Sequence, residues 1–417
     1  MTYETRCCVA GGGPAGMMLG VLLARAGVHV VVLEKHADFL RDFRGDTVHP
    51  STLEVMYELG VLDDFLARPH AELREVRGMI GDERVTLADF SHLPVHAPFI
   101  AMMPQWDFLD FLAEQGRRYP TFQLVMEAEV FELIERDARV VGVRAQTPGE
   151  TLDIYANLVV GADGRSSTVR SLGRLPVQDV GAPIDVLWMR LSKKPSDSAT
   201  AALGNVRNGH VFVMLDRGDY WQCAYVIPKG GYDELRRGGL DAFRAEIVSV
   251  VGFLWDRVRE IRAWEDVKLL TVKVDRLPQW HRPGLLCIGD AAHAMSPVGG
   301  VGINLAIQDA VAAANILWEP LQRGVPSAAD LQAVQRRREL PARITQRAQV
   351  YVQEHVLFRT LKSGVPTKLP LVAKLLNRYP ALRRIPARLV GLGVRPEHVR
   401  TPDVLGESNP TSAPSHR

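Results

Sequence analysis

The order of apolar and polar runs predicts that the chain begins as a strand, a helix and a second strand. An apolar run at residues 7–10 ends in a cluster of glycines, and a mostly apolar stretch with helical spacing follows at 17–26. A second apolar run, at 28–33, ends on Glu34. Continuous apolar runs of this kind are typical of buried parallel strands. Residues 7–34 therefore predict one βαβ unit.

Later runs predict a different sheet and a helical end. Short, Pro-interrupted runs at 76–100 and alternating runs at 180–229 are typical of antiparallel strands. Helical spacing recurs at 243–261 and again at 310–361. We therefore expect an excursion from the first domain into an antiparallel sheet, followed by helices.

The glycines after the first strand are spaced as in a loop that holds a pyrophosphate. Gly11, Gly13 and Gly16 form G-x-G-x-x-G, and Pro14 suits the first helical turn. The three glycines permit a tight turn, a close backbone approach to phosphate, and close packing of helix on sheet. Glu34 can bind ribose hydroxyls and would repel a 2′-phosphate. The unit predicts a tightly held FAD or NAD rather than NADP.

Two further glycine turns follow buried strands. The stretch 155–170 holds Asp163 before Gly164, and the stretch 284–308 holds Gly289 before Asp290. In the second stretch, Gly-rich residues 299–302 flank a predicted helix start, whose free N–H groups can stabilise an anionic ring or phosphate. Taken alone, the first stretch is more often a simple turn, and the second is also consistent with a flexible glycine loop.

Composition narrows the classes of function. At 417 residues the chain predicts two or three domains, and a net charge of +2 gives no basic excess for nucleic-acid binding. The four cysteines lie in apolar runs without metal-ligand spacing, so we expect core residues in a reducing compartment and no metal. The N-terminus leaves no room for a secretory signal, and no 18-residue apolar run is free of charge. We expect a cytoplasmic protein.

Together the three glycine motifs resemble one family, the single-component FAD-dependent monooxygenases of the para-hydroxybenzoate hydroxylase type, also called class A flavoprotein hydroxylases. The resemblance covers residues 5–345. It rests on GGGPAG with Glu34 and Lys35, on VVGADGRSSTVR, and on GLLCIGDAAHAMSPVGGVGINLAIQDA, in that order.

The resemblance implies an α/β fold, with a Rossmann-type FAD-binding domain on a parallel sheet, an antiparallel-sheet substrate domain and a helical C-terminal segment. We expect the discontinuous FAD-binding domain at 1–75, 101–180 and 270–345, the substrate-binding sheet domain at 76–100 and 181–269, the helical C-terminal segment at 346–405, and a disordered tail at 406–417.

The resemblance also implies a cofactor site. The residues expected at the FAD pyrophosphate are Gly11, Gly13, Pro14, Ala15 and Gly16, with Glu34 and the adjoining Lys35 at the adenosine ribose. Arg44 and Gln105 match positions near the pyrophosphate and ribityl chain, and Val130 matches one beside the adenine.

The other two motifs complete the expected site. Asp163 matches a motif that serves both FAD and the nicotinamide, and Asp290, after Gly289, matches the residue that holds the ribityl or pyrophosphate region. The residues expected against the isoalloxazine ring are Pro297, Gly299, Gly300, Val301, Gly302, Ile303 and Asn304.

The implied reaction is reduction of FAD by NADPH or NADH, capture of O2 as a flavin C4a-hydroperoxide, and oxygen transfer to a phenolic or related aromatic substrate. A second Rossmann fingerprint is absent from the sequence, so we expect the nicotinamide to bind transiently. No obvious catalytic acid or base stands out. Pro297 and two residues of the predicted substrate sheet, His210 and Tyr225, are the candidate catalytic residues. A monomer and a homodimer both stay open.

Three rival functions remain. Flavin-dependent halogenases share the fold but typically carry W-x-W-x-I-P where this chain reads CAYVIP at 223–228. A reductase or dehydrogenase acting on a lipid or quinone, and a flavin-loaded binding protein without turnover, are the others. The basic, apolar stretch 369–394 is either a packed helical segment or an interfacial membrane helix. Pro380 and Pro386 favour the packed segment, so membrane association is not expected.

Overall fold

A parallel sheet built from strands far apart in the sequence forms the centre of the first half of the molecule. The computed structural model describes residues 1–40, 47–197, 202–363 and 369–406. The sheet has the order β19 (His281–Arg282), β20 (Leu285–Cys287), β11 (Thr151–Gly161), β1 (Thr2–Ala10), β2 (Val30–Leu33) and β8 (Phe122–Val125). The strands β10 (Arg139–Gln146) and β9 (Glu129–Arg136) extend from β11 as an antiparallel hairpin.

The parallel strands end at one edge of this sheet. Ala10 of β1 pairs with Leu33 of β2 and with Gly161 of β11, which in turn pairs with Cys287 of β20. All four residues are buried. Because each of three motifs directly follows one of these strand ends, the fold brings motifs that are more than 100 residues apart to the same edge.

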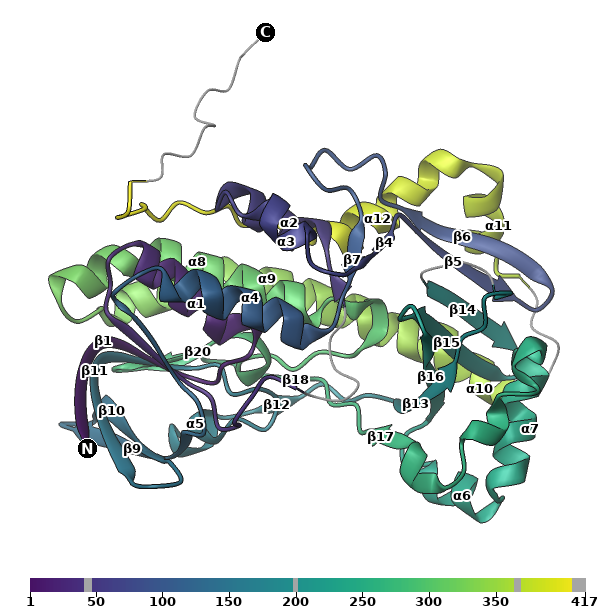
Figure 1. Cartoon of the computed structure of the whole chain (residues 1–417), viewed down its shortest axis with the longest axis horizontal. Helices are drawn as coiled ribbons and strands as arrows, with labels where there is room; N and C mark the ends of the chain where they lie inside the picture. Colours follow the sequence, from purple (N-terminus) through teal and green to yellow (C-terminus); the bar gives the residue numbers. More distant parts are fainter. Residues whose placement is uncertain (41–46, 198–201, 364–368, 407–417) are drawn as a thin grey trace, which may run out of the picture.

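Helices cover one face of the sheet, and the β9–β10 hairpin lies on the other side of the molecule (Figure 1). The covering helices are α1 (Pro14–Arg25), α4 (Gln105–Arg117), α8 (Gly302–Arg323) and α9 (Ala328–Val352). The helix α1 packs between α4 and α8. All four cysteines are free and buried, as expected of core residues, and burial raises the pKa of the Cys8 thiol to about 12.

A mostly antiparallel sheet forms the second half of the molecule. Its order is β17 (Lys268–Leu270), β13 (Ile184–Ser192), β16 (Tyr220–Pro228), β15 (His210–Asp216), β14 (Ala202–Arg207), β5 (Glu75–Ile80) and β6 (Glu83–Asp89). The helices α6 (Tyr232–Arg237) and α7 (Leu240–Val250) lie beside it (Figure 1). The α/β fold with a second, antiparallel sheet is thus confirmed. The domain boundaries stay a prediction.

One predicted helix is shorter than expected. Helical spacing predicts a helix over 243–261, but α7 ends at Val250 and only 3-10 turns follow, at Gly252–Leu254 and Val258–Glu260. The buried Arg257 side chain reaches Asp197, with 3.1 Å between Nη2 and Oδ1. The chain therefore leaves the helical path where it makes this ion pair.

Short elements connect the two sheets. A small sheet contains β3 (Thr47–Val48), β7 (Ile100–Met102) and β4 (Ala71–Leu73), with α2 (Pro50–Glu58) and α3 (Leu62–Leu66) nearby, and β12 (Gln178–Asp179) pairs with β18 (Asp275–Arg276). The remaining helices are α5 (Thr168–Leu172), α10 (Phe358–Ser363), α11 (Leu371–Arg378) and α12 (Arg384–Gly391).

The stretch Val298–Arg323, which contains α8, is long and apolar enough to cross a membrane by length and composition. However, 67% of its most apolar window is buried inside the protein, as in the core helix of a globular fold.

A buried ion network ties α8 to its surroundings. The Asp309 carboxylate on α8 accepts hydrogen bonds from Gly289 N at 3.0 Å, His293 Nε2 at 2.6 Å and Arg338 Nε at 3.0 Å. Arg338 also lies 3.4 Å from Glu397 near the C-terminus. Burial alone would raise the pKa of Asp309, but His293 and Arg338 outweigh burial and hold its pKa below the usual range. Asp309 is therefore a buried carboxylate with hydrogen-bond partners on two other segments.

We expect the substitution Asp309→Asn to lower the free energy of unfolding by about 3–5 kcal/mol, because it leaves the Arg338 charge buried without a full partner. Guanidinium titration of the variant measures this loss. The matched control on α9 is Glu339→Gln, which breaks a more exposed ion pair with Arg343 (3.3 Å) and should cost less than about 1 kcal/mol. Equal losses in the two variants would show that the network does not hold the fold.

Candidate functional site

The glycine loop after β1 requires glycine at two positions. Gly11 has a φ of +111°, and a Cβ there would lie 2.4 Å from the carbonyl oxygen of Ala162. A Cβ on Gly16 would lie 1.9 Å from the carbonyl oxygen of Gly11. Neither position has room for a side chain, because the loop presses the start of α1 against the ends of β1 and β11.

The first turn of α1 is open toward an anion. Its N-cap, Gly13, has no side-chain cap, and the turn contains no acidic residue. A Cβ added to Gly13 would meet no atom of the described residues within 4 Å, so there is space beside this backbone. Uncapped N–H groups at a helix N-terminus attract phosphate. Gly13, Pro14 and Ala15 therefore fit the pyrophosphate of a dinucleotide.

Glu34 is held at the end of β2 by backbone donors. Its carboxylate accepts hydrogen bonds from Gly12 N and from His36 N, each at 3.1 Å. The side chain is thus fixed against the glycine loop, in the position expected of a ribose-binding acid.

Four other predicted cofactor residues have less direct positions. Lys35 is exposed, and its Nζ lies 3.7 Å from Oε1 of Glu129. Val130, which follows Glu129 on β9, is buried. Gln105 is half-buried in the first turn of α4. Arg44 lies outside the described residues. Their contacts with a cofactor stay predictions.

The second and third motifs lie at the ends of neighbouring strands and are joined by an ion pair. Arg165, after β11, places Nη2 at 3.7 Å from Oδ2 of Asp290, after β20. Asp163 has a different environment, because its carboxylate accepts hydrogen bonds from the Ser167 hydroxyl and from Val169 N at 3.0 Å. Asp163 thus caps the start of α5, whereas Asp290 remains half-exposed at its strand end.

The loop before α8 turns on two glycines in the left-handed region. Gly299 has a φ of +80° and Gly300 a φ of +63°. Thr47 Oγ1 donates to the Gly300 carbonyl at 2.9 Å. The helix begins at Gly302 without a side-chain cap, so a second free helix N-terminus faces this loop. Pro297, Val298 and Val301 of the loop are half-buried, as is Ile303 in the first turn of α8.

Asn304, in the first turn of α8, carries a buried donor without a partner. Its Oδ1 accepts hydrogen bonds from His49 N at 3.0 Å and Thr52 Oγ1 at 2.7 Å. Its Nδ2 is buried and finds no acceptor among the described residues. An unpaired buried donor is costly. The orphan amide, together with two open helix N-termini, fits a large polar and anionic cofactor such as FAD.

His49 also supports this loop, although it lies in none of the three glycine motifs. Its Nδ1 donates to the carbonyl oxygen of Val390 on α12 at 2.8 Å. Burial lowers the pKa of His49 to about 4, so the imidazole is neutral near pH 7. No local sequence signal connects His49 with Val390 or Asn304, since these residues are more than 200 positions away.

The structure brings His210 and Tyr225 together, but not to this loop. The Tyr225 hydroxyl lies 2.5 Å from His210 Nδ1 and donates to Glu246 of α7 at 2.7 Å. Burial, followed by the Glu246 carboxylate, raises the pKa of Tyr225 well above its usual value. The ring packs on Phe243 of α7. Both candidate catalytic residues thus lie on the α7 face of the sheet.

The opposite face of the sheet contacts the loop before α8. Val298 packs in a cluster with Val206, Val211 and Val226. Strand alternation places Tyr225 on the other face from its neighbour Val226. The sheet therefore separates His210 and Tyr225 from the loop before α8, and this position does not favour a direct catalytic role.

A row of four residues, of which two are small, crosses the loop-facing side of the sheet. Gly204 pairs with Val213, Val213 with Ala224, and Ala224 with Trp188, so the four residues share the face that bears Val226. A Cβ on Gly204 would meet no described atom within 4 Å. Trp188 Nε1 is buried and has no partner among the described residues. The row thus combines open space beside Gly204 with an unused donor on Trp188. Strand alternation could have shown which residues of a strand share a face, but neither the space nor the unused donor.

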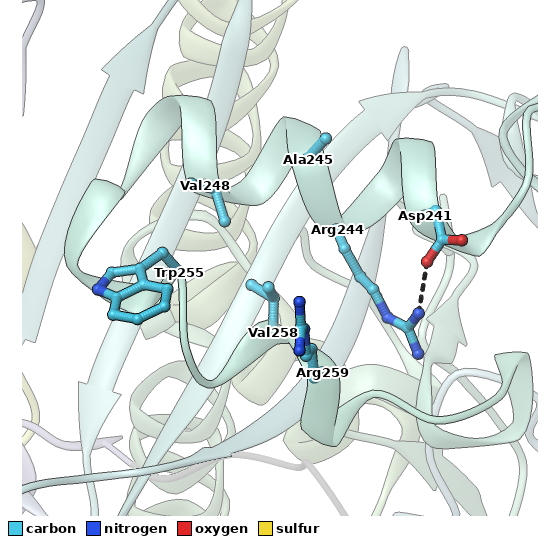
Figure 2. Close-up of a pocket in the computed structure, with 7 residues that line it drawn as sticks. All are labelled: Asp241, Arg244, Ala245, Val248, Trp255, Val258 and Arg259. Atoms are coloured by element: carbon cyan, nitrogen blue, oxygen red, sulfur yellow. Dashed lines mark hydrogen bonds and ion pairs between the residues drawn. The ribbon is translucent and has the colours of Figure 1, made fainter.

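An open pocket of about 690 Å³ lies elsewhere, on the outer side of α7. Figure 2 shows Arg244, bonded to Asp241, with Trp255 and Arg259 on the segment that follows the helix. The sheet-facing residues of α7, such as Phe243, point the opposite way. This pocket is therefore separated from the three motifs by α7 and the sheet. Among the described residues, no group of His, Cys, Asp and Glu could hold a metal ion.

Comparison with known proteins agrees with this geometry. The sequence pattern of the FAD binding domain family matches residues 4–348. The 6-methylpretetramide 4-monooxygenase of Streptomyces rimosus is 33% identical over 98% of this chain and 97% of its own length. The rifampicin monooxygenase of Streptomyces venezuelae is 31% identical over 75% of this chain and 63% of its own length. The anhydrotetracycline hydroxylase OxyS of S. rimosus has the same fold, with a TM-score of 0.73 and 24% identity over 94% of this chain and 77% of that structure.

The fold and the three motifs define a flavoprotein with a Rossmann-type FAD-binding domain. Within that class, the chain belongs to the family of FAD-dependent monooxygenases. The predicted family and its FAD cofactor are confirmed. The individual contacts between residues and FAD stay predictions.

Two glycine substitutions should separate cofactor binding from folding. In Gly13→Val the new side chain meets open space, so we expect the apoprotein to fold while FAD occupancy falls at least tenfold, because the side chain fills the place of the pyrophosphate. In Gly16→Val the clash with Gly11 should prevent folding. The flavin absorbance per chain and far-UV circular dichroism distinguish the two. Full FAD occupancy in Gly13→Val would contradict the placement of the pyrophosphate.

Proposed function

We propose that this protein is an NAD(P)H- and FAD-dependent monooxygenase that hydroxylates a phenolic or related aromatic small molecule. One observation supports this most directly: two open helix N-termini and the unpaired Nδ2 of Asn304 lie together near one edge of the parallel sheet. The second sheet meets this region where Val298 packs on Val211 and Val226, on the face that bears the row of Gly204 and Ala224. The family membership supports the same reaction class.

The residues at the sheet edge would hold FAD along its length. Glu34 would bind the adenosine ribose and the first turn of α1 the pyrophosphate, with Asp290 near the ribityl chain. The uncapped start of α8 would face the isoalloxazine ring and stabilise negative charge there. When bound, FAD supplies electron transfer from NAD(P)H and the activation of O2.

The second sheet would position the substrate. Val211 and Val226 lie in the neighbouring cross-strand row and form an apolar wall with Val298 alongside the first row, which would exclude water from the reacting ring. Gly204 would leave room for part of a flat ring, and Trp188 Nε1 could donate to an oxygen on that ring. In this arrangement the protein contributes placement and dryness, which suits a substrate that enters already activated by its own hydroxyl group.

Labelled oxygen tests the reaction. A panel of phenolic aromatic compounds that includes 6-methylpretetramide would first be screened for stimulated NAD(P)H consumption. For the best substrate, we expect one atom of ¹⁸O from ¹⁸O₂ in each product molecule, because a monooxygenase transfers one oxygen atom. Product without the isotope, or product formed equally well without oxygen, would show that the protein is a reductase or dehydrogenase rather than a monooxygenase.

A pair of tryptophan variants tests where the substrate binds. Trp188→Phe keeps the aromatic ring but removes the donor, so KM should rise roughly tenfold, as for the loss of one buried hydrogen bond. Trp255→Phe, in the outer pocket beside α7, is the matched control and should leave KM unchanged. If instead Trp255→Phe raises KM and Trp188→Phe does not, the substrate binds in the outer pocket.

A further inference from the structure

Two short helices near the C-terminus present an apolar face to solvent. Leu371 and Val372 on α11 are 73% and 68% exposed, and Ile385 and Leu389 on α12 are 59% and 57% exposed. We call this surface the outer face, and its apolar residues are Leu371, Val372, Leu375, Tyr379, Leu382, Ile385 and Leu389. Large exposed apolar surfaces of this kind mark contact sites.

The outer face is one side of a firmly packed segment. Ala373 on α11 is buried against Val85, and Ala387 on α12 is buried in a cluster with Phe90. Both helices pack on the strand β6, at the outer margin of the second sheet (Figure 1). Because the two helices are anchored on the same strand, their exposed sides both point away from it, so one flat surface can contact both.

Basic side chains surround the outer face. Lys374, Arg378, Arg384 and Arg388 are exposed, and none of them forms an ion pair within the described chain. Residues 369–394 contain no Asp or Glu. Arg383, by contrast, donates to the carbonyl oxygen of Leu376 at 2.9 Å and caps α11. Every charged side chain that the segment 369–394 contributes around the outer face is therefore cationic.

We propose that the outer face docks the protein on an anionic lipid bilayer. Apolar side chains flanked by Lys and Arg are the pattern of helices that lie in the interface of a membrane. Anionic head groups complement the four exposed cations, and each cation adds to the attraction. A second copy of this chain fits less well, because its own outer face would bring the same positive charges together. The sequence alone favoured a packed segment, and the structure shows that packing and an exposed amphipathic side occur together.

Vesicle flotation of the full, FAD-loaded chain tests this surface. We expect the protein to float with vesicles of phosphatidylglycerol and phosphatidylcholine. With vesicles of pure phosphatidylcholine it should remain at the bottom of the gradient. Binding should weaken in 0.5 M NaCl, because salt screens charge attraction. Equal binding to both kinds of vesicle, or no binding to the anionic ones, would overturn the proposal.

Variants locate the contact. Since each Lys or Arg near an anionic surface strengthens binding roughly fivefold, Arg384→Ser with Arg388→Ser should weaken it roughly 30-fold. Leu371→Ser with Leu389→Ser should also release the protein. The matched control removes an exposed aromatic residue and an exposed cation beside α7, Trp255→Ser with Arg259→Ser, and should bind like the unmodified chain.

Two readouts accompany the flotation. The flavin absorbance of each variant shows that it is folded, since none of the substituted residues is among those assigned to FAD. Light scattering reports the mass of the protein in solution. Unchanged vesicle binding by both outer-face variants, or a dimer that these variants dissociate, would overturn the proposal in favour of another surface or a second copy of the chain.

Discussion

The buried carboxylate of Asp309 is the constraint on which the rest of the structure depends. It fixes the backbone of Gly289, which turns the chain at the end of β20, and it binds His293 one turn later. Arg338 brings α9 to the same carboxylate and contacts Glu397 as well. A charge removed from water in this way is tolerated only when its partners are in place. The turn that positions Asp290, two long helices and the C-terminal segment are therefore coupled through this one carboxylate and its Arg338 partner.

The sequence predicts the FAD half well, because its signals are local. A glycine that must adopt a positive φ or approach backbone closely, as at Gly11 and Gly16, can be recognised from its spacing to the glycines a few residues away. The same holds for Glu34, which ends a strand and bonds to the neighbouring loop. Parallel strands then bring such loops to one edge by a general rule of the fold, so three local motifs were enough to predict that these loops meet.

The second sheet shows where prediction from sequence stops. Aromatic and polar side chains made His210 and Tyr225 attractive candidates, but their face of the sheet is decided by which helix covers it, and α7 covers theirs. The row containing Gly204 and Ala224 faces the loop before α8 instead. Alternation says that neighbours differ in face, but it does not say which face meets the cofactor domain. That choice depends on packing between segments that are distant in the sequence.

Long-range hydrogen bonds connect the cofactor loop to the outer surface of the protein. The backbone of His49 bonds to Asn304, in the first turn of α8, and its neutral imidazole bonds to Val390 on α12. Because His49 is buried and uncharged, both bonds have fixed geometry rather than the mobility of a surface ion pair. The helix α12 thus has two roles on opposite sides: its inner side braces the residues that start α8, and its outer side carries Ile385 and Leu389 into solvent. One residue, His49, therefore links α12 to the first turn of α8, beside the loop where the flavin ring is expected. The outer face and the cofactor site are connected by these hydrogen bonds, although they share no residue.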